Sequence, residues 1–102
     1  MKKWSNQYYR LLYVYVYQIT SSSSLAEEIT KETLLRAYER SDKLKGEPET
    51  GNWMIRTARY LILKEVYSSW ERGEDIHEKY DLPDIVDPSA MKSIIEQYEE
   101  NE

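Results

Sequence analysis

The sequence predicts an all-α fold, because helix breakers are few and apolar residues recur at helical spacing. The 102 residues include three prolines and three glycines. Apolar positions return every three or four residues in three separate stretches, and little of the chain alternates as a strand would. Hydrophobic residues make up 40% of the chain, which is enough for one modest core. We therefore expect a three-helix bundle, followed by an acidic linker and a short C-terminal helix.

The first helix is predicted from about Asn6 to Ile19. Its centre reads YVYVY over residues 13–17 and would also suit a β-strand, since tyrosine and valine favour sheets. A helix is preferred because a lone strand would have no partner and the apolar residues fall at helical spacing. These apolar residues are Tyr8, Leu11, Leu12, Tyr15 and Ile19.

The second helix is expected to follow a run of four serines, residues 21–24, and to end near Arg40. Ser24 and Glu27 have the spacing of a capping box, in which the hydroxyl and the carboxylate each satisfy a free backbone N–H. The helix divides into two faces. Its apolar stripe is Leu25, Ala26, Ile29, Thr33, Leu34 and Ala37, and its charged face is Glu27, Glu28, Lys31, Glu32 and Glu39.

The third helix is predicted from Trp53 to Glu71, after a loop over residues 41–52 that is rich in glycine, proline and charge. Its spacing gives one buried face and a second face that carries cations and aromatic rings. The buried face is Met54, Thr57, Ala58, Leu61, Ile62 and Val66. The second face is Arg56, Arg59, Tyr60, Leu63, Tyr67 and Trp70.

Charge is segregated along the chain. Residues 1–70 carry 11 Lys and Arg against 8 Asp and Glu, a net +3. Residues 71–102 carry 3 against 11, a net −8. The overall charge of −5 therefore hides a mildly basic body, which weakens the argument that an acidic protein avoids nucleic acid. Residues 73–87 are predicted to be the acidic linker, and Asp87-Pro88 opens a helix that runs to about Tyr98.

Several classes of function have no support in the sequence. The chain has no cysteine, and no apolar run is long enough to span a bilayer or resembles a signal peptide. No nucleophile triad, phosphate-binding glycine loop or metal-ligand cluster is present, and His77 lies among acidic residues where a solvated side chain is expected. We therefore expect no enzyme, no metal site and no cofactor, and we expect a cytoplasmic protein without membrane insertion.

Two blocks of sequence resemble region 2 of the extracytoplasmic-function (ECF) sigma factors of bacterial RNA polymerase. LAEEITKETLLRAYER, residues 25–40, is similar to the pattern A-E-D-L-V-Q-E-T-F-L-R-A-W. GNWMIRTARYLILKE, residues 51–65, is similar to W-L-Y-R-I-A-R-N-x-x-x-D. The resemblance covers roughly residues 6–72. The residues that carry it are Ala26, Glu27, Glu32, Leu35, Arg36, Ala37, Gly46, Trp53, Arg56, Ala58 and Arg59.

The resemblance implies a sigma region 2 domain over residues 1–72. Residues 73–102 would be an acidic linker and the start of a helix leading toward a region 4 that these residues do not include. The implied function is transcription initiation: the domain would bind core RNA polymerase and recognise and melt the promoter −10 element. An anti-sigma factor is a further expected partner.

The resemblance also implies two sets of binding residues. The clamp coiled coil of the largest polymerase subunit would bind Glu28, Lys31, Glu32 and Arg36. The non-template DNA strand would bind Lys43, Lys45, Gly46, Thr50, Asn52, Arg56, Arg59 and Tyr60. Unpaired bases need aromatic faces to stack on and cations for their phosphates, which agrees with arginines beside tyrosines in the third helix.

The sequence departs from the family pattern at several positions. Lys31 stands in place of glutamine, Tyr60 in place of asparagine and Lys64 in place of aspartate, and YSSWER replaces a basic run. Fewer cations predict weaker electrostatic DNA affinity.

Other interpretations remain open. The charges of the second helix could form a solvated face, Arg56 and Arg59 could pair with the acidic tail, and Tyr67 and Trp70 could pack under the C-terminal helix. The chain could then be a degenerate sigma-like interaction module that binds polymerase or an anti-sigma factor but little DNA. An unrelated helical bundle with a tyrosine-rich dimer face is the least specific alternative.

Overall fold

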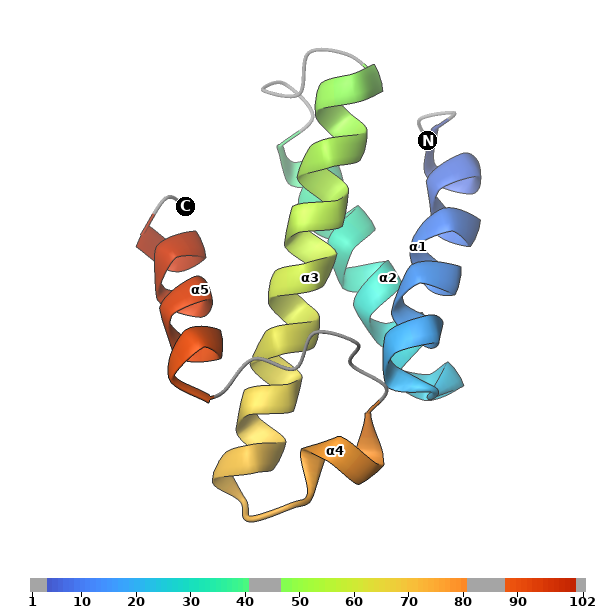
Figure 1. Ribbon diagram of the computed structural model, residues 1–102. Helices are drawn as coiled ribbons and strands as arrows, with labels where there is room; N and C mark the ends of the chain where they lie inside the picture. The colour runs from blue at the N-terminus through green and yellow to red at the C-terminus, as the bar shows by residue number, and fades with distance from the viewer. Residues whose placement is uncertain (1–3, 41–46, 81–87, 101–102) are drawn as a thin grey trace.

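The computed structural model is a bundle of helices around one long central helix (Figure 1). It describes residues 4–40, 47–80 and 88–100, and within those ranges it contains no strand. Helices α1 and α2 pack on α3 from one side and α5 packs on it from the other. The prediction of an all-α bundle with a C-terminal helix is therefore confirmed. The elements are α1 (Trp4–Thr20), α2 (Ser23–Glu39), α3 (Glu47–Glu71), α4 (Ile76–Lys79) and α5 (Pro88–Glu100).

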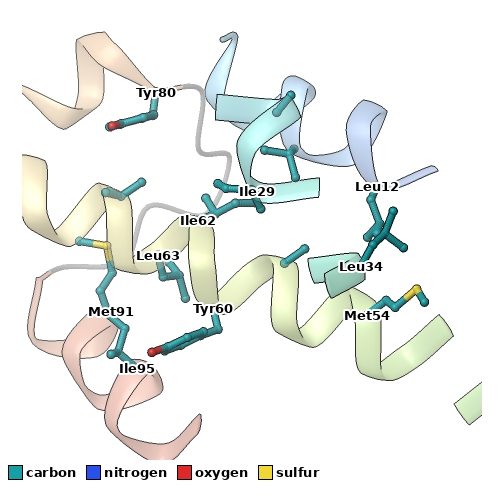
Figure 2. Close-up of a cluster of buried hydrophobic side chains, with 14 of the residues drawn as sticks. Leu12, Ile29, Leu34, Met54, Tyr60, Ile62, Leu63, Tyr80, Met91 and Ile95 are labelled. Atoms are coloured by element: carbon teal, nitrogen blue, oxygen red, sulfur yellow. The ribbon is translucent and has the colours of Figure 1, made fainter. Parts of the chain in front are cut away.

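The core is formed where α1, α2 and α3 meet. Leu12 and Val16 of α1 and Met54 of α3 are completely buried, and Figure 2 shows Leu12 and Met54 pointing toward Leu34 of α2. The buried positions of α1 recur every fourth residue, as one face of a helix requires. Leu11 lies outside that face with 52% of its surface exposed, so its predicted place on the apolar face was wrong.

Helix α2 begins at a cap different from the predicted one. Ser21 has a φ of 54°, which turns the chain sharply after α1 and places Ser22 in an extended conformation. The Ser22 hydroxyl then accepts a hydrogen bond of 3.2 Å from the backbone N–H of Leu25. Ser24 lies inside the first turn, and the Glu27 carboxylate instead pairs with Lys31 at 3.0 Å. The predicted capping box was therefore wrong, and the cap lies two residues earlier, at Ser22.

This cap gives a direct mutational prediction. Ser22→Ala should lower the free energy of unfolding by about 1 kcal/mol, because the N–H of Leu25 loses its acceptor. Ser24→Ala, the same change two residues later, should alter stability by less than about 0.5 kcal/mol. Urea denaturation of both variants measures the difference. Equal losses for the two serines would contradict the assignment of Ser22 as the cap.

Helix α3 begins at Glu47, so residues 47–52 of the predicted loop are helical. Pro48 falls in the first turn, where a proline removes no intrahelical hydrogen bond. Gly51 would ordinarily weaken a helix, but here it packs on α1, and a β-carbon built at Gly51 would lie 3.6 Å from the Tyr8 hydroxyl. Tertiary packing thus outweighs the local helix-breaking signal.

The end of α3 lies at Glu71, as predicted. Gly73 has a φ of 85°, and its N–H donates to the carbonyl of Trp70 at 2.9 Å. The N–H of Glu74 donates to the carbonyl of Ser69 at 3.0 Å, which completes a Schellman motif. Glycine suits this position because the left-handed conformation is strained for other residues.

The first part of the predicted acidic linker is packed and not free. Ile76 at the start of the short helix α4 and Tyr80 just after its end are each 3% exposed, and the Tyr80 hydroxyl lies 3.0 Å from that of Ser69 in α3. Glu74 forms ion pairs with Arg72 at 2.9 Å and with Lys79 at 2.6 Å. The acidic residue at the start of this segment therefore has local partners, and residues 73–80 belong to the body of the fold.

Candidate polymerase-binding and nucleic-acid-binding surfaces

The four residues predicted to bind polymerase lie together on α2. Glu28 and Lys31 are exposed, and Glu32 and Arg36 are partly buried. Residues four apart lie one above another on a helix, so Glu28, Glu32 and Arg36 form one stripe with Lys31 beside it. Two ion pairs order their ends, Lys31 with Glu27 at 3.0 Å and Arg36 with Glu32 at 2.8 Å. We call this stripe, with Lys31 and Leu35, the α2 outer face.

Leu35 is a residue of this face that the sequence reasoning did not include among the binding residues. It is 54% exposed, one helical turn beyond Lys31 and Glu32. An apolar side chain ringed by charges is typical of the centre of a protein interface, where burial on binding stabilises the complex. The signal was present in the sequence, because Leu35 falls outside the apolar stripe of its own helix.

A groove runs between α2 and α3 beside the outer face. Its volume is about 320 Å³. Glu28 and Glu32 line one wall and Lys64 lies on the other, while Ile29 and Leu61 add apolar surface. A protein side chain with an apolar stem and a polar tip would find both contact and hydrogen-bonding groups in this groove.

The residues predicted to bind DNA are placed in several different environments. Lys43, Lys45 and Gly46 lie outside the described residues. Thr50 is buried with 6% of its surface exposed, whereas Asn52 is exposed near the start of α3. The structure therefore does not bring the whole predicted set together in one surface.

Arg56 and Arg59 do lie together, beside a second hollow of about 460 Å³ that we call the arginine hollow. Both are exposed, and within the described ranges neither forms an ion pair, so the alternative that they pair with the acidic tail finds no support there. The guanidinium of Arg40 lies 5.9 Å from the ring centre of Trp53. The hollow is lined by Arg40, Trp53, Arg56, Arg59 and Tyr60 from the body, and by Ile94, Gln97 and Tyr98 from α5.

The chemistry of the arginine hollow suits an unpaired nucleotide. Guanidinium groups bind phosphate oxygens through short, charge-assisted hydrogen bonds. Aromatic rings offer faces on which a base can stack, and this stacking is tolerant of sequence. A third feature is unexpected, since one wall of the hollow is supplied by a helix from the acidic tail.

Tyr60 was predicted to lie on an exposed face of α3, and that placement was wrong. It is 4% exposed because α5 covers it, and Leu63 on the same side is 7% exposed (Figure 2). The Tyr98 ring stacks on Tyr60 at a centroid distance of 4.1 Å. The Tyr60 hydroxyl donates a hydrogen bond of 2.6 Å to the Glu99 carboxylate. Burial, together with this hydrogen bond, raises the pKa of Tyr60 to about 12.

A signal for this burial existed in the tail itself. Met91, Ile95 and Tyr98 have the i, i+4, i+7 spacing of an apolar helical face. Such a face needs a partner, and the partner turns out to be the second face of α3. Farther along α3, Tyr67 is partly buried and Trp70 remains 44% exposed, with their ring centres 5.5 Å apart.

Comparison with known proteins identifies the family. The model of the Sigma-70 region 2 family matches residues 5–72, which is two-thirds of the chain. Neither the curated proteins nor the solved structures contain a significant match. No helix among the described residues is long and apolar enough to cross a membrane. The matched segment contains the α2 outer face and the body side of the arginine hollow, and the chain therefore belongs to the Sigma-70 region 2 family.

Proposed function

We propose that the chain is a transcription initiation factor domain of the ECF type, which acts in the cytoplasm. In this proposal the α2 outer face binds the clamp coiled coil of the largest RNA polymerase subunit. The N-terminal half of α3 binds the non-template strand of the promoter −10 element. Membership of the Sigma-70 region 2 family supports a role in polymerase binding and promoter melting.

The observation that carries the proposal of polymerase binding is the exposed Leu35 within a charged helix face. Leu35 is 54% exposed, and burial against a partner would remove its side chain from water. The flanking Glu32 and Arg36 are already ordered by their mutual ion pair, so they lose little freedom when a partner binds. Such a preordered stripe suits the polar sides of a coiled coil.

The chain offers a matched pair of variants for the test. Leu35→Glu should weaken binding to the isolated clamp coiled coil by about tenfold or more, because it places a charge at the centre of the interface. Leu11→Glu makes the same change on α1 at nearly equal exposure, 52% against 54%, and should bind as the unmodified chain does. Fluorescence anisotropy of the labelled coiled coil measures both. Equal affinities for the two variants would remove the α2 outer face from the proposal.

The DNA half is supported by the exposed pair Arg56 and Arg59 beside the Trp53 ring. We propose that Asn52 and Thr50, together with Lys43, Lys45, Gly46 and Tyr60, complete this surface when the strand is bound. Arg59→Ala should weaken binding of a −10-like single-stranded oligonucleotide and reduce its dependence on salt, since one phosphate contact is lost.

A second candidate function follows from the cover over Tyr60. If α5 never leaves α3, the chain would be an interaction module that binds polymerase, or an anti-sigma factor, but little DNA. The two proposals share the coiled-coil result and differ in the oligonucleotide result. Polymerase binding by the intact chain without any oligonucleotide binding would favour the interaction module.

A further inference from the structure

Helix α5 docks on the face of α3 that the proposed function assigns to DNA. Its buried side chains are Met91, fully buried, and Ile95, 8% exposed (Figure 2). They cover Tyr60 and Leu63 of α3, both nearly inaccessible to solvent. The contact is local to one side of the bundle, since α1 and α2 lie on the other side of α3 (Figure 1). Removing α5 would therefore expose this face without opening the three-helix core.

The aromatic contact has the geometry of a stacked base. The Tyr98 ring lies 4.1 Å from the Tyr60 ring, with the two planes inclined by 13°. The Tyr98 hydroxyl lies 2.9 Å from that of Thr57, one turn earlier in α3. A flat ring on an aromatic face, fixed at its edge by a hydrogen bond, is also how proteins bind unpaired bases.

The charges of the contact correspond to those of a phosphate site. The Glu99 carboxylate accepts the hydroxyl hydrogen of Tyr60 at 2.6 Å and lies 3.8 Å from the Lys64 ammonium. The cations of Lys64 and Arg36 lie 5.5 Å and 5.9 Å from the centre of the Tyr60 ring. The Glu99 anion therefore lies beside a hydroxyl donor and the Lys64 ammonium, a setting that a nucleic-acid phosphate would also favour.

We propose that α5 is an intramolecular competitor of single-stranded DNA: Tyr98 takes the place of a base, and Glu99 takes the place of a phosphate. This inference rests on the proposed function of α3. The DNA surface is then regulated by the position of α5, and the domain binds DNA fully when α5 leaves. Of the α2 outer face, Arg36 interacts with Tyr98 of α5, and the exposed Glu28, Lys31 and Leu35 are accessible to polymerase while α5 is docked.

The expected change in DNA affinity depends on the fraction of molecules in which α5 is docked. A site that is open for a fraction of the time binds with an apparent dissociation constant raised by the inverse of that fraction. If α5 is docked about nine-tenths of the time, its release should increase DNA affinity on the order of tenfold. The affinity for the clamp coiled coil should change little.

The test compares two variants that remove the same charge from the same helix. Glu99→Gln removes the anion from Tyr60 and Lys64, whereas Glu96→Gln changes an exposed residue on α5. Anisotropy of a −10-like single-stranded oligonucleotide is measured with the full chain. Glu99→Gln should bind several-fold more tightly than Glu96→Gln, and Glu96→Gln should match the unmodified chain apart from a small gain from its lost charge. Equal gains in oligonucleotide affinity for the two variants would mean that only the net charge matters, and would overturn the proposal that α5 competes with DNA.

A second variant separates the inference from the proposed function. Met91→Gln places an amide in the buried seam and should release α5, which hydrogen exchange of residues 88–100 detects. Release with tighter oligonucleotide binding supports the competitor. If α5 is released and the variant binds the oligonucleotide with the same measurable affinity as the unmodified chain, α5 is not a competitor, and the proposal that the domain binds DNA still stands. If α5 is released and no oligonucleotide binds, both the competition by α5 and the DNA binding of the domain are overturned. If exchange stays slow in Met91→Gln, α5 has not been released, and the comparison of Glu99→Gln with Glu96→Gln decides.

Discussion

Leu12→Ala is expected to lower the free energy of unfolding by about 2–5 kcal/mol. Leu12 is fully buried where α1 meets α2 and α3, so its removal leaves a cavity in the centre of the bundle (Figure 2). The rigid packing of three helices limits how far the neighbours can move to fill it. Domains of this size are stable by about 5–15 kcal/mol, so the loss would be a large share of the total.

The adjacent residue provides the control for Leu12. Leu11→Ala removes the same atoms from the same helix at a site that is 52% exposed. Its effect should stay within about 0.5 kcal/mol, because a half-exposed side chain leaves no cavity. Thermal or urea denaturation of the two variants gives the comparison. A large loss at Leu11 with a small one at Leu12 would mean that α1 is rotated relative to the core described above.

The second large effect is expected at alkaline pH. Burial and the hydrogen bond to Glu99 raise the pKa of Tyr60 from 10.0 to about 12. Because the folded pKa lies above the unfolded value, this tyrosine's contribution to stability is complete below pH 10 and is lost as the pH rises toward about 12. The docking of α5 should therefore weaken over that interval, since a tyrosinate cannot donate to the Glu99 carboxylate.

Absorbance of tyrosinate in the near ultraviolet measures this titration. The difference between the unmodified chain and Tyr60→Phe isolates one ring among ten tyrosines, and it should titrate near pH 12. Glu99→Gln should lower the pKa of Tyr60, because the hydroxyl then loses its charged acceptor. A difference curve centred near pH 10 in the unmodified chain would contradict the contact between Tyr60 and Glu99.

The sequence was sufficient for the helices that have a clear apolar period. The α1 assignment held despite the strand-like YVYVY segment, because residues four apart, such as Leu12 and Val16, form its buried face. The errors occurred where two signals were nearly equivalent. Four consecutive serines offer several possible caps, and the backbone turn at Ser21 selects Ser22. Gly51 marks a helix interior here because α1 packs on it.

The candidate site was predictable on α2 and less so on α3. Helix α2 presents its charges on its own outer face, so spacing within one helix is enough to group Glu32 and Arg36. The environment of Tyr60 depends on α5, whose Glu99 lies 39 residues further along the chain. No period within α3 can reveal such a partner. The apolar spacing of α5 indicated that it had a buried face, but not which surface would cover it.

We propose the clamp coiled coil of RNA polymerase as the partner of the α2 outer face. The most direct test of this proposal is a titration of the isotopically labelled chain with the unlabelled coiled coil, followed by amide chemical shifts. If the α2 outer face binds the coiled coil, the largest shifts should lie between Glu28 and Arg36, include Leu35, and leave the exposed side of α1 around Leu11 unchanged. No shifts, or shifts centred on α1 instead, would contradict it.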